Sequence, residues 1–119
     1  MPEITVYPVF RDVNGTGPDP DLSPLPVVAR VGNYSSGWRV ETHAHRRGQL
    51  MFITSGSMRV ESRDGSWITP PGRACWIPSA AAHGVTYTQP SEMQTVLIAP
   101  ELLANLAAGI FILPFFLFS

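Results

Sequence analysis

The sequence predicts a single all-β domain, and three observations support this fold class. The chain has 119 residues, about one domain's worth, which excludes a complete two-domain enzyme. Its 12 prolines and 10 glycines divide it into short pieces, which disfavours long helices and favours strands joined by tight turns. From residue 27 onward, short apolar runs recur at the spacing typical of a β-sandwich or β-barrel.

The elements are predicted in chain order. Residues 4–10 form a short apolar run that predicts a strand. Residues 11–26 contain glycines and prolines and are predicted to be a loop that acts as a spacer or lid, so that residues 1–26 make an N-terminal arm and loop. Residues 27–100 are predicted to form the barrel. Its eight strands are expected at residues 27–31, 38–42, 49–54, 58–62, 66–69, 74–77, 84–88 and 93–99.

One hairpin is predicted between residues 58–62 and 66–69. The Asp64-Gly65 dipeptide indicates it, because glycine tolerates the positive φ that a two-residue turn demands. Alternation along the first strand places Met58 and Val60 inward, with Arg59 and Glu61 outward.

Two further segments carry a structural prediction. Residues 50–53 are apolar on both faces, which predicts a central strand covered on each side. Residues 101–119 are predicted to be a short C-terminal helix, starting after Pro100, and an apolar tail. The stretch 106–118 contains Gly109 and Pro114 and is shorter than the roughly 20 residues of a membrane span. Packing or partner contact is the preferred interpretation of the tail; a truncated or frame-shifted end and membrane contact are the alternatives.

Composition excludes several classes of protein. The net charge is -1, and all eight positive side chains are arginines without a basic stripe, so no direct nucleic-acid contact is expected from this chain. The single cysteine, Cys75, excludes an intrachain disulfide and fits a reducing compartment. We expect its thiol to be buried and inert. No signal peptide is apparent, so the expected location is cytoplasmic and no membrane partner is expected.

The three histidines of the chain form a candidate metal site. His43 and His45 stand at i and i+2, so on an extended strand both rings leave the same face about 6.5 to 7 Å apart. That separation suits two ligands of one ion, because imidazole nitrogens bind at about 2.0 to 2.1 Å. Pairing between strands can bring His83 alongside. The alternative is that the three rings line a ligand pocket without a metal.

The spacing of glycines and histidines has two parts. The first part runs Gly37, five residues, His43, one residue, His45, three residues, Gln49, six residues, Gly56. The second part runs Gly72, five residues, Pro78, one residue, Ala80, two residues, His83. This pattern resembles the two-part signature of the cupin superfamily. The resemblance implies a double-stranded β-helix, a jelly-roll-like barrel, with His43, His45, Gln49 and His83 around a divalent metal.

The chain departs from the cupin pattern at three positions. Gln49 stands where the family has a glutamate, Ala80 where it has a glycine, and Tyr87 where an asparagine often closes the second part. Gln49 removes a negative charge, so a divalent ion would be held by neutral ligands only and less tightly. Sites of this kind accept zinc, nickel, iron, copper or manganese.

A narrower resemblance covers residues 27–103. The segments that carry it are residues 43–50, 55–60, 65–67, 70–74, 76–78, 93–95 and 99–102. They resemble the N-terminal sensor domain of AraC-type transcription regulators. In that family a cupin that binds a small molecule, and often dimerises, precedes a linker and two helix-turn-helix motifs. The resemblance implies an effector-sensing, homodimeric domain whose chain stops where the linker would begin, so that it lacks the DNA-binding half.

Four further side chains are assigned to the ligand pocket: Met51, Trp76, Trp38 and Arg47. The alternative for the aromatic residues and Met51 is a core position, and for the adjacent pair Arg46 and Arg47 a solvated one.

The preferred function is therefore effector sensing, with a metal that positions the effector and no catalytic residue. The rivals are a stand-alone metal-dependent cupin enzyme, a dioxygenase or isomerase, and a folded but silent remnant.

Overall fold

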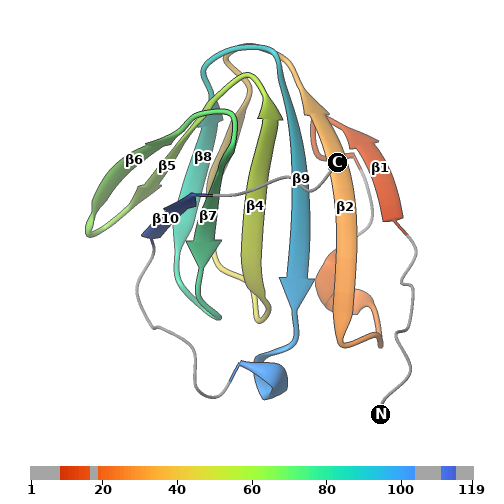
Figure 1. Cartoon of the computed structure of the whole chain (residues 1–119). Coiled ribbons are helices and arrows are strands. Elements are labelled where there is room, and N and C mark those ends of the chain that lie inside the picture. The colour runs from red at the N-terminus through yellow and green to blue at the C-terminus, as the bar shows by residue number, and fades with distance from the viewer. Residues whose placement is uncertain (1–8, 17–18, 104–110, 115–119) are drawn as a thin grey trace.

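The computed structural model describes residues 9–16, 19–103 and 111–114, and in this part of the chain it is built almost wholly of strands (Figure 1). The strands are β1 (Val9–Val13), β2 (Val27–Tyr34), β3 (Arg39–His43), β4 (Gly48–Ser55), β5 (Met58–Ser62), β6 (Gly65–Thr69), β7 (Arg73–Ile77), β8 (His83–Tyr87), β9 (Ser91–Ile98) and β10 (Phe111–Pro114). Two three-residue 3-10 turns, η1 (Pro20–Leu22) and η2 (Pro100–Leu102), flank the barrel.

The strands form two sheets. The larger sheet has the order β1-β2-β9-β4-β7-β10, and the smaller has the order β3-β8-β5-β6. Neighbouring strands are antiparallel except β1 and β2, which run parallel. Figure 1 shows the sheets as two layers, with β4, β9 and β2 of the larger sheet toward the viewer. This arrangement confirms the predicted all-β, double-stranded β-helix.

All eight predicted barrel strands are confirmed, with ends that move by up to three residues. Strand β4 lies between β9 and β7, which confirms that residues 50–53 belong to a central strand. The predicted hairpin pairs β5 with β6 from Met58 opposite Thr69 to Ser62 opposite Gly65. Its turn residues are therefore 63 and 64, and Gly65 has a φ of +145°, a conformation that other residues rarely adopt.

The two ends of the chain differ from their predictions. Residues 11–13, expected in a loop, continue β1, and their backbone pairs with β2. Of the strand expected at residues 4–10, only residues 9 and 10 are described, and both are in β1. The backbone of residues 111–114, expected in the tail, pairs with β7. Of the expected C-terminal helix, the described residues show only the η2 turn at Pro100–Leu102, and residues 104–110 and 115–119 lie outside the described part. Among the described residues, no helix is long and apolar enough to cross a membrane.

The core lies between the sheets, and its polarity changes along the barrel. Its apolar members come from both layers: Met51, Ile53, Met58, Val60, Cys75, Ile77, Val85, Tyr87 and Met93. Burial of each large side chain contributes about 1.5 to 3 kcal/mol. On β8 the inward positions run from His83 through Val85 to Tyr87, and on β4 they run from Gln49 to Met51. One end of the barrel is therefore polar and the other apolar.

Candidate metal centre and ligand cavity

Three histidines from separate segments meet at the polar end of the barrel. His43 ends β3 and His83 begins β8, and the two are partners in the antiparallel register. His45 lies two residues beyond β3. The ring centroids are 4.5 Å apart for His43 and His83, 5.0 Å for His45 and His83, and 5.5 Å for His43 and His45. Their candidate ligand atoms lie within 4.8 Å of one another, so the cluster could hold one metal ion.

Backbone carbonyls fix the orientation of each ring. Nδ1 of His43 lies 2.8 Å from the Glu41 oxygen, Nδ1 of His45 lies 2.7 Å from the Arg47 oxygen, and Nδ1 of His83 lies 2.8 Å from the Ala81 oxygen. A carbonyl oxygen only accepts, so each Nδ1 carries the proton and donates it. In the neutral rings, Nε2 then presents a lone pair, as in histidines that bind metals.

Gln49 adds an oxygen to the three nitrogens. Its Nε2 donates to Oγ1 of Thr95 at 3.0 Å, and that hydroxyl donates to the Leu50 carbonyl at 3.1 Å. This orients Oε1 of Gln49 toward Nε2 of His45, at 2.9 Å. Both atoms are acceptors when His45 is neutral, so a proton or a cation is needed between them. A cation held by both atoms would use both lone pairs.

His83 is the most buried of the three ligand candidates, with 1% of its surface exposed. Burial is the largest cause that lowers its pKa, to about 4, and the charges of His43 and His45 lower it further, whereas the bond to the Ala81 carbonyl raises it. At neutral pH the ring is therefore uncharged. Its nitrogen can bind a metal without first releasing a proton.

Two hollows adjoin the histidines. The inner one, of about 190 Å³, extends between the sheets. It is lined by Gly15, Arg30, Gly32, Tyr34, Val40, His43, Gln49, Met51, His83, Val85, Tyr87, Met93 and Thr95. The outer one, of about 330 Å³, lies between η1 and the histidines. It is lined by Asp19, Pro20, Asp21, Arg30, His43, Ala44, His45, Gln49 and Leu97. Arg30, His43 and Gln49 line both, so the two hollows meet at the polar end of the barrel.

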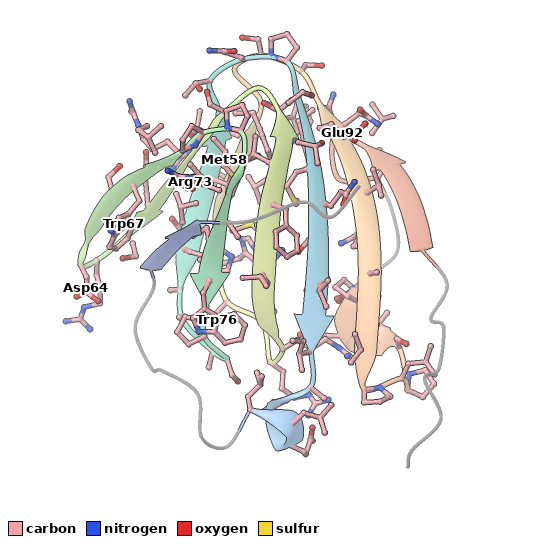
Figure 2. All side chains as sticks on the ribbon, in the orientation of Figure 1. Met58, Asp64, Trp67, Arg73, Trp76 and Glu92 are labelled. Carbon is pink, nitrogen blue, oxygen red and sulfur yellow. The ribbon has the colours of Figure 1, made fainter. Side chains whose placement is uncertain are left out.

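The four side chains assigned to the pocket lie in different places. Met51 is 2% exposed and lines the inner hollow. Trp38, just before β3, is 41% exposed. Trp76, labelled on β7 in Figure 2, is buried beside Gly48 and Leu103. Neither of these two neighbours is among the described residues that line the two hollows. Trp38, Trp76 and Arg47 are not among the described residues that line either hollow.

Arg47 fastens the N-terminal arm to the barrel. It is 1% exposed, and its guanidinium donates to the carbonyl oxygens of Ser23, Leu25 and Pro26 at 2.9, 2.6 and 3.1 Å. Its Nε lies 3.7 Å from Oδ1 of Asp21. The alternative of a solvated pair is thus wrong for Arg47, because these carbonyls replace water around its charge. Arg46 is exposed and pairs with Glu101 at 2.9 Å.

Sequence reasoning missed two residues of the site, Arg30 and Thr95. Arg30 lies on β2, where alternate positions 30, 32 and 34 line the inner hollow. The sequence could have indicated Arg30, because it stands at one of the alternate strand positions whose side chains point inward. Thr95 occupies the same kind of position on β9, two residues from Met93. Its role depends on Gln49, which is far away in sequence, so no local pattern indicates it.

Comparison with known proteins agrees with this geometry. The family described as AraC-like ligand binding domain matches residues 25–118. The chain belongs to this family. It is 33% identical over 59 residues to the HTH-type transcriptional regulator NimR of Escherichia coli (strain K12), a match that covers 50% of this chain and 22% of that protein. The matched segment thus spans about a fifth of that relative's length.

Solved structures share the fold of this AraC-like ligand-binding domain. An RmlC-like cupin from Shewanella frigidimarina has a TM-score of 0.58 at 18% identity, covering 61% of this chain and 66% of that chain. A conserved protein of unknown function from Streptococcus pyogenes has a TM-score of 0.61 at 14% identity, covering 84% and 91%. KdgF from Halomonas sp. has a TM-score of 0.58 at 21% identity, covering 65% and 74%. At identities this low, the likeness shows a common cupin-like fold alone.

Proposed function

We propose that this AraC-like domain senses a small-molecule effector for an intracellular transcription regulator and that a divalent transition metal helps to hold the effector. One observation carries the proposal: three histidine nitrogens and the Gln49 amide oxygen converge where two hollows meet. The family match supports effector binding. Contact with DNA would come from other parts of the regulator, as the name of the relative NimR suggests.

The donor set fits a transition-metal ion. Nε2 of His43, His45 and His83 and Oε1 of Gln49 would hold it, and zinc, nickel, iron, copper and manganese all accept such donors. When bound, the ion supplies a Lewis-acidic attachment point for an oxygen of the effector. The chain's own residues orient these donors. Backbone carbonyls orient the histidine rings, and Thr95 orients the amide of Gln49.

Signal transmission requires a ligand that stabilises one arrangement of the domain over another. The arm is suited to this role, because Asp19, Pro20 and Asp21 form a wall of the outer hollow and Arg47 anchors the residues that follow. An effector that touches both the arm and the histidines would change how firmly the arm is held. We propose that this change is passed to the rest of the regulator.

A homodimer is part of the proposal. Strand β6 is an edge of the smaller sheet, and Ile68 on it is 51% exposed, so a second copy could cover apolar surface there. Light scattering at low micromolar concentration tests this: a mass of twice the 13.0 kDa chain is expected, and a monomer would exclude it.

The main experiment separates a sensor from an enzyme. Purified protein is assayed for metal by plasma mass spectrometry and then screened for thermal stabilisation by sugars and by aromatic and aliphatic acids. A sensor should bind metal and be stabilised by a ligand class without converting it. Oxygen uptake with catechols, thiols or diketones above the metal-free control would instead support the second candidate, a cupin enzyme, which three histidine ligands with open positions also permit.

A further inference from the structure

We infer that the homodimer forms at the outer edge of β6, where the β6 strands of two copies pair antiparallel about a two-fold axis at Trp67. The smaller sheets of the two copies then join into one continuous sheet. This rests on the proposed function, because it takes the homodimer as given. It goes further by naming the register and the residues that meet.

Strand β6 is an edge strand without the usual protection against pairing. The opposite edge of the smaller sheet, β3, carries the charged residues Arg39 and Glu41 and a register shift between Val40 and His43. Charges and bulges of this kind keep an edge strand from pairing with another chain. The β6 sequence, Gly-Ser-Trp-Ile-Thr, has no charge and no proline, and its pairing with β5 is regular. Figure 1 shows the β5–β6 hairpin projecting from the barrel, which leaves this edge open to a second copy.

The hydrogen bonds of the smaller sheet show which backbone groups of β6 point to the outer edge. The Thr88 N–H donates to the Ser57 carbonyl, so odd-numbered residues of β5 bond to β8 and even-numbered ones bond to β6. The β6 partners of residues 58, 60 and 62 are residues 69, 67 and 65. The N–H and C=O groups of Ser66 and Ile68 therefore point outward, where no described strand pairs with β6.

These groups match their own copies in one register. With Ser66 opposite the partner's Ile68, the two residues exchange hydrogen bonds, and the two-fold axis repeats the pair. Moving the axis by one residue in one direction sets Ser66 opposite the partner's Pro70, which has no N–H and lies beyond the strand. Moving it in the other direction sets Ile68 opposite the partner's Asp64, whose N–H already donates to Oγ of Ser62 at 3.1 Å.

The side chains at the axis suit this register. The two copies of Trp67 form a non-hydrogen-bonded pair, in which the Cα atoms are about 4.5 Å apart and the side chains are close. Trp67 is half-buried in the single chain, and Figure 2 labels it on the projecting hairpin. Aromatic pairs across two strands stabilise a sheet, so a second copy buries more of this ring favourably.

The charges beside the edge are complementary across the axis. Within one copy, Arg59 is opposite Ile68 and Glu61 is opposite Ser66. Each row across the joined sheet then begins at Glu61, crosses Ser66 and the partner's Ile68, and ends at the partner's Arg59. Opposite charges stand at the two ends of each row, and no like charges are directly opposite. This pattern favours a second copy of the chain as the occupant.

Trp67→Cys tests the position of the axis. A disulfide needs Cα atoms about 4.4 to 6.8 Å apart, which the pair at the axis provides. We expect oxidised glutathione to convert most of this variant to a linked dimer on non-reducing electrophoresis. In the control Arg63→Cys, on the same hairpin, the two thiols would lie about 27 Å apart at about 3.4 Å per residue, so the yield should be at least tenfold lower. Cys75 is fully buried, so the wild-type chain should give no linked dimer.

A second variant tests the edge without changing Trp67. Ile68→Lys adds a charge to β6, as protected edge strands have, and should raise the dissociation constant of the dimer at least tenfold in light scattering over a dilution series. Leu22→Lys is the control, because Leu22 is 82% exposed on η1 and should leave the constant unchanged.

Two results overturn the inference and assign the homodimer to another surface: equal disulfide yields for the two cysteine variants, or an unaltered dissociation constant for Ile68→Lys. A wild-type chain that stays monomeric overturns the homodimer of the proposed function, and this inference falls with it. The proposed effector and metal sites stand in either case, because neither depends on β6.

Discussion

The amide oxygen of Gln49 lies 2.9 Å from Nε2 of His45, and neither atom supplies a proton when His45 is neutral. The amide cannot simply rotate to remove this contact, because its nitrogen donates to Thr95 and the Thr95 hydroxyl donates onward to Leu50. The chain thus orients two acceptors toward one point. The most direct test of that arrangement is to remove the hydroxyl that maintains it.

Thr95→Val should lower zinc affinity about 10- to 100-fold, the usual effect of losing a group that orients a metal ligand. The fold should survive, because valine has the same shape as threonine. Calorimetric zinc titration measures the affinity, and circular dichroism checks the fold. Thr86→Val makes the same change at an outward position of β8 and should leave zinc affinity unchanged. Equal affinities in the two variants would contradict an orienting role for Thr95.

His43→Ala and His83→Ala should each abolish metal retention while the barrel stays folded. Loss of one ligand should exceed the 10- to 100-fold effect of losing an orienting group. Metal content after dialysis, measured by plasma mass spectrometry, gives the result. His43 is exposed, so its replacement leaves the core intact. Metal retained by both variants at the wild-type level would defeat the ligand assignment.

Zinc should stabilise the folded protein, and a chelator should reverse the effect. At 100 times its dissociation constant, a ligand specific for the native state contributes about 2.7 kcal/mol. For a domain of this size that is roughly 10 °C in Tm. Thermal unfolding followed by circular dichroism is the measurement. An unchanged Tm at saturating zinc would mean that the ion does not bind the folded protein in preference to the unfolded chain.

Arg47→Met should loosen the arm. It removes hydrogen bonds from a charged donor to three carbonyls, each worth about 1.5 to 3 kcal/mol while buried, although carbonyls that reach water recover part of this. We expect a net loss of about 2 to 4 kcal/mol in urea unfolding and faster protease cleavage within residues 19–26. Arg46→Met is the matched control, and it should change little because its pair with Glu101 is exposed. An arm that is cut no faster than in the wild type would argue against Arg47 as its anchor.

The Cys75 thiol should be inert in the folded protein. Burial is the main cause that raises its pKa, to about 12. At pH 8 only about one thiol in 10,000 is then ionised. Its contribution to stability is complete below pH 9 and is lost as pH rises toward 12, because the unfolded chain releases the proton first. Reaction with a disulfide reagent should be at least 1,000-fold slower than in urea; comparable rates would show an accessible thiol.

Short-range patterns in the sequence predicted much of the fold. Alternation of apolar and polar residues placed Met58 and Val60 inside, and both are fully buried. The spacing of His43, His45 and His83 predicted a cluster, and the cluster is present. For Met58, Val60 and the pair His43 and His45, neighbouring residues carry the information, because a strand alternates its faces every residue. The place of His83 came from the two-part spacing that resembles the cupin signature.

Interactions with backbone groups and pairings across long distances were not predictable in the same way. Arg47 binds carbonyl oxygens of Ser23, Leu25 and Pro26, and a carbonyl has no sequence signature. The pairing of β10 with β7 joins residues more than thirty positions apart. Arg30 lies at an inward position of β2, and this alternation could in principle be read from the sequence. It becomes clear only when the strand is extended to Tyr34, because the predicted strand ended at residue 31.

The hydrogen bond from each imidazole to a backbone carbonyl two residues away has a consequence for the signal that the domain can give. The rings are preorganised, so coordination requires little loss of rotational entropy and little rearrangement of the surrounding backbone. Saturation with metal alone should therefore leave the domain in nearly the same shape. Metal alone would then leave the signal unchanged, and a response would need the organic molecule together with the bound metal.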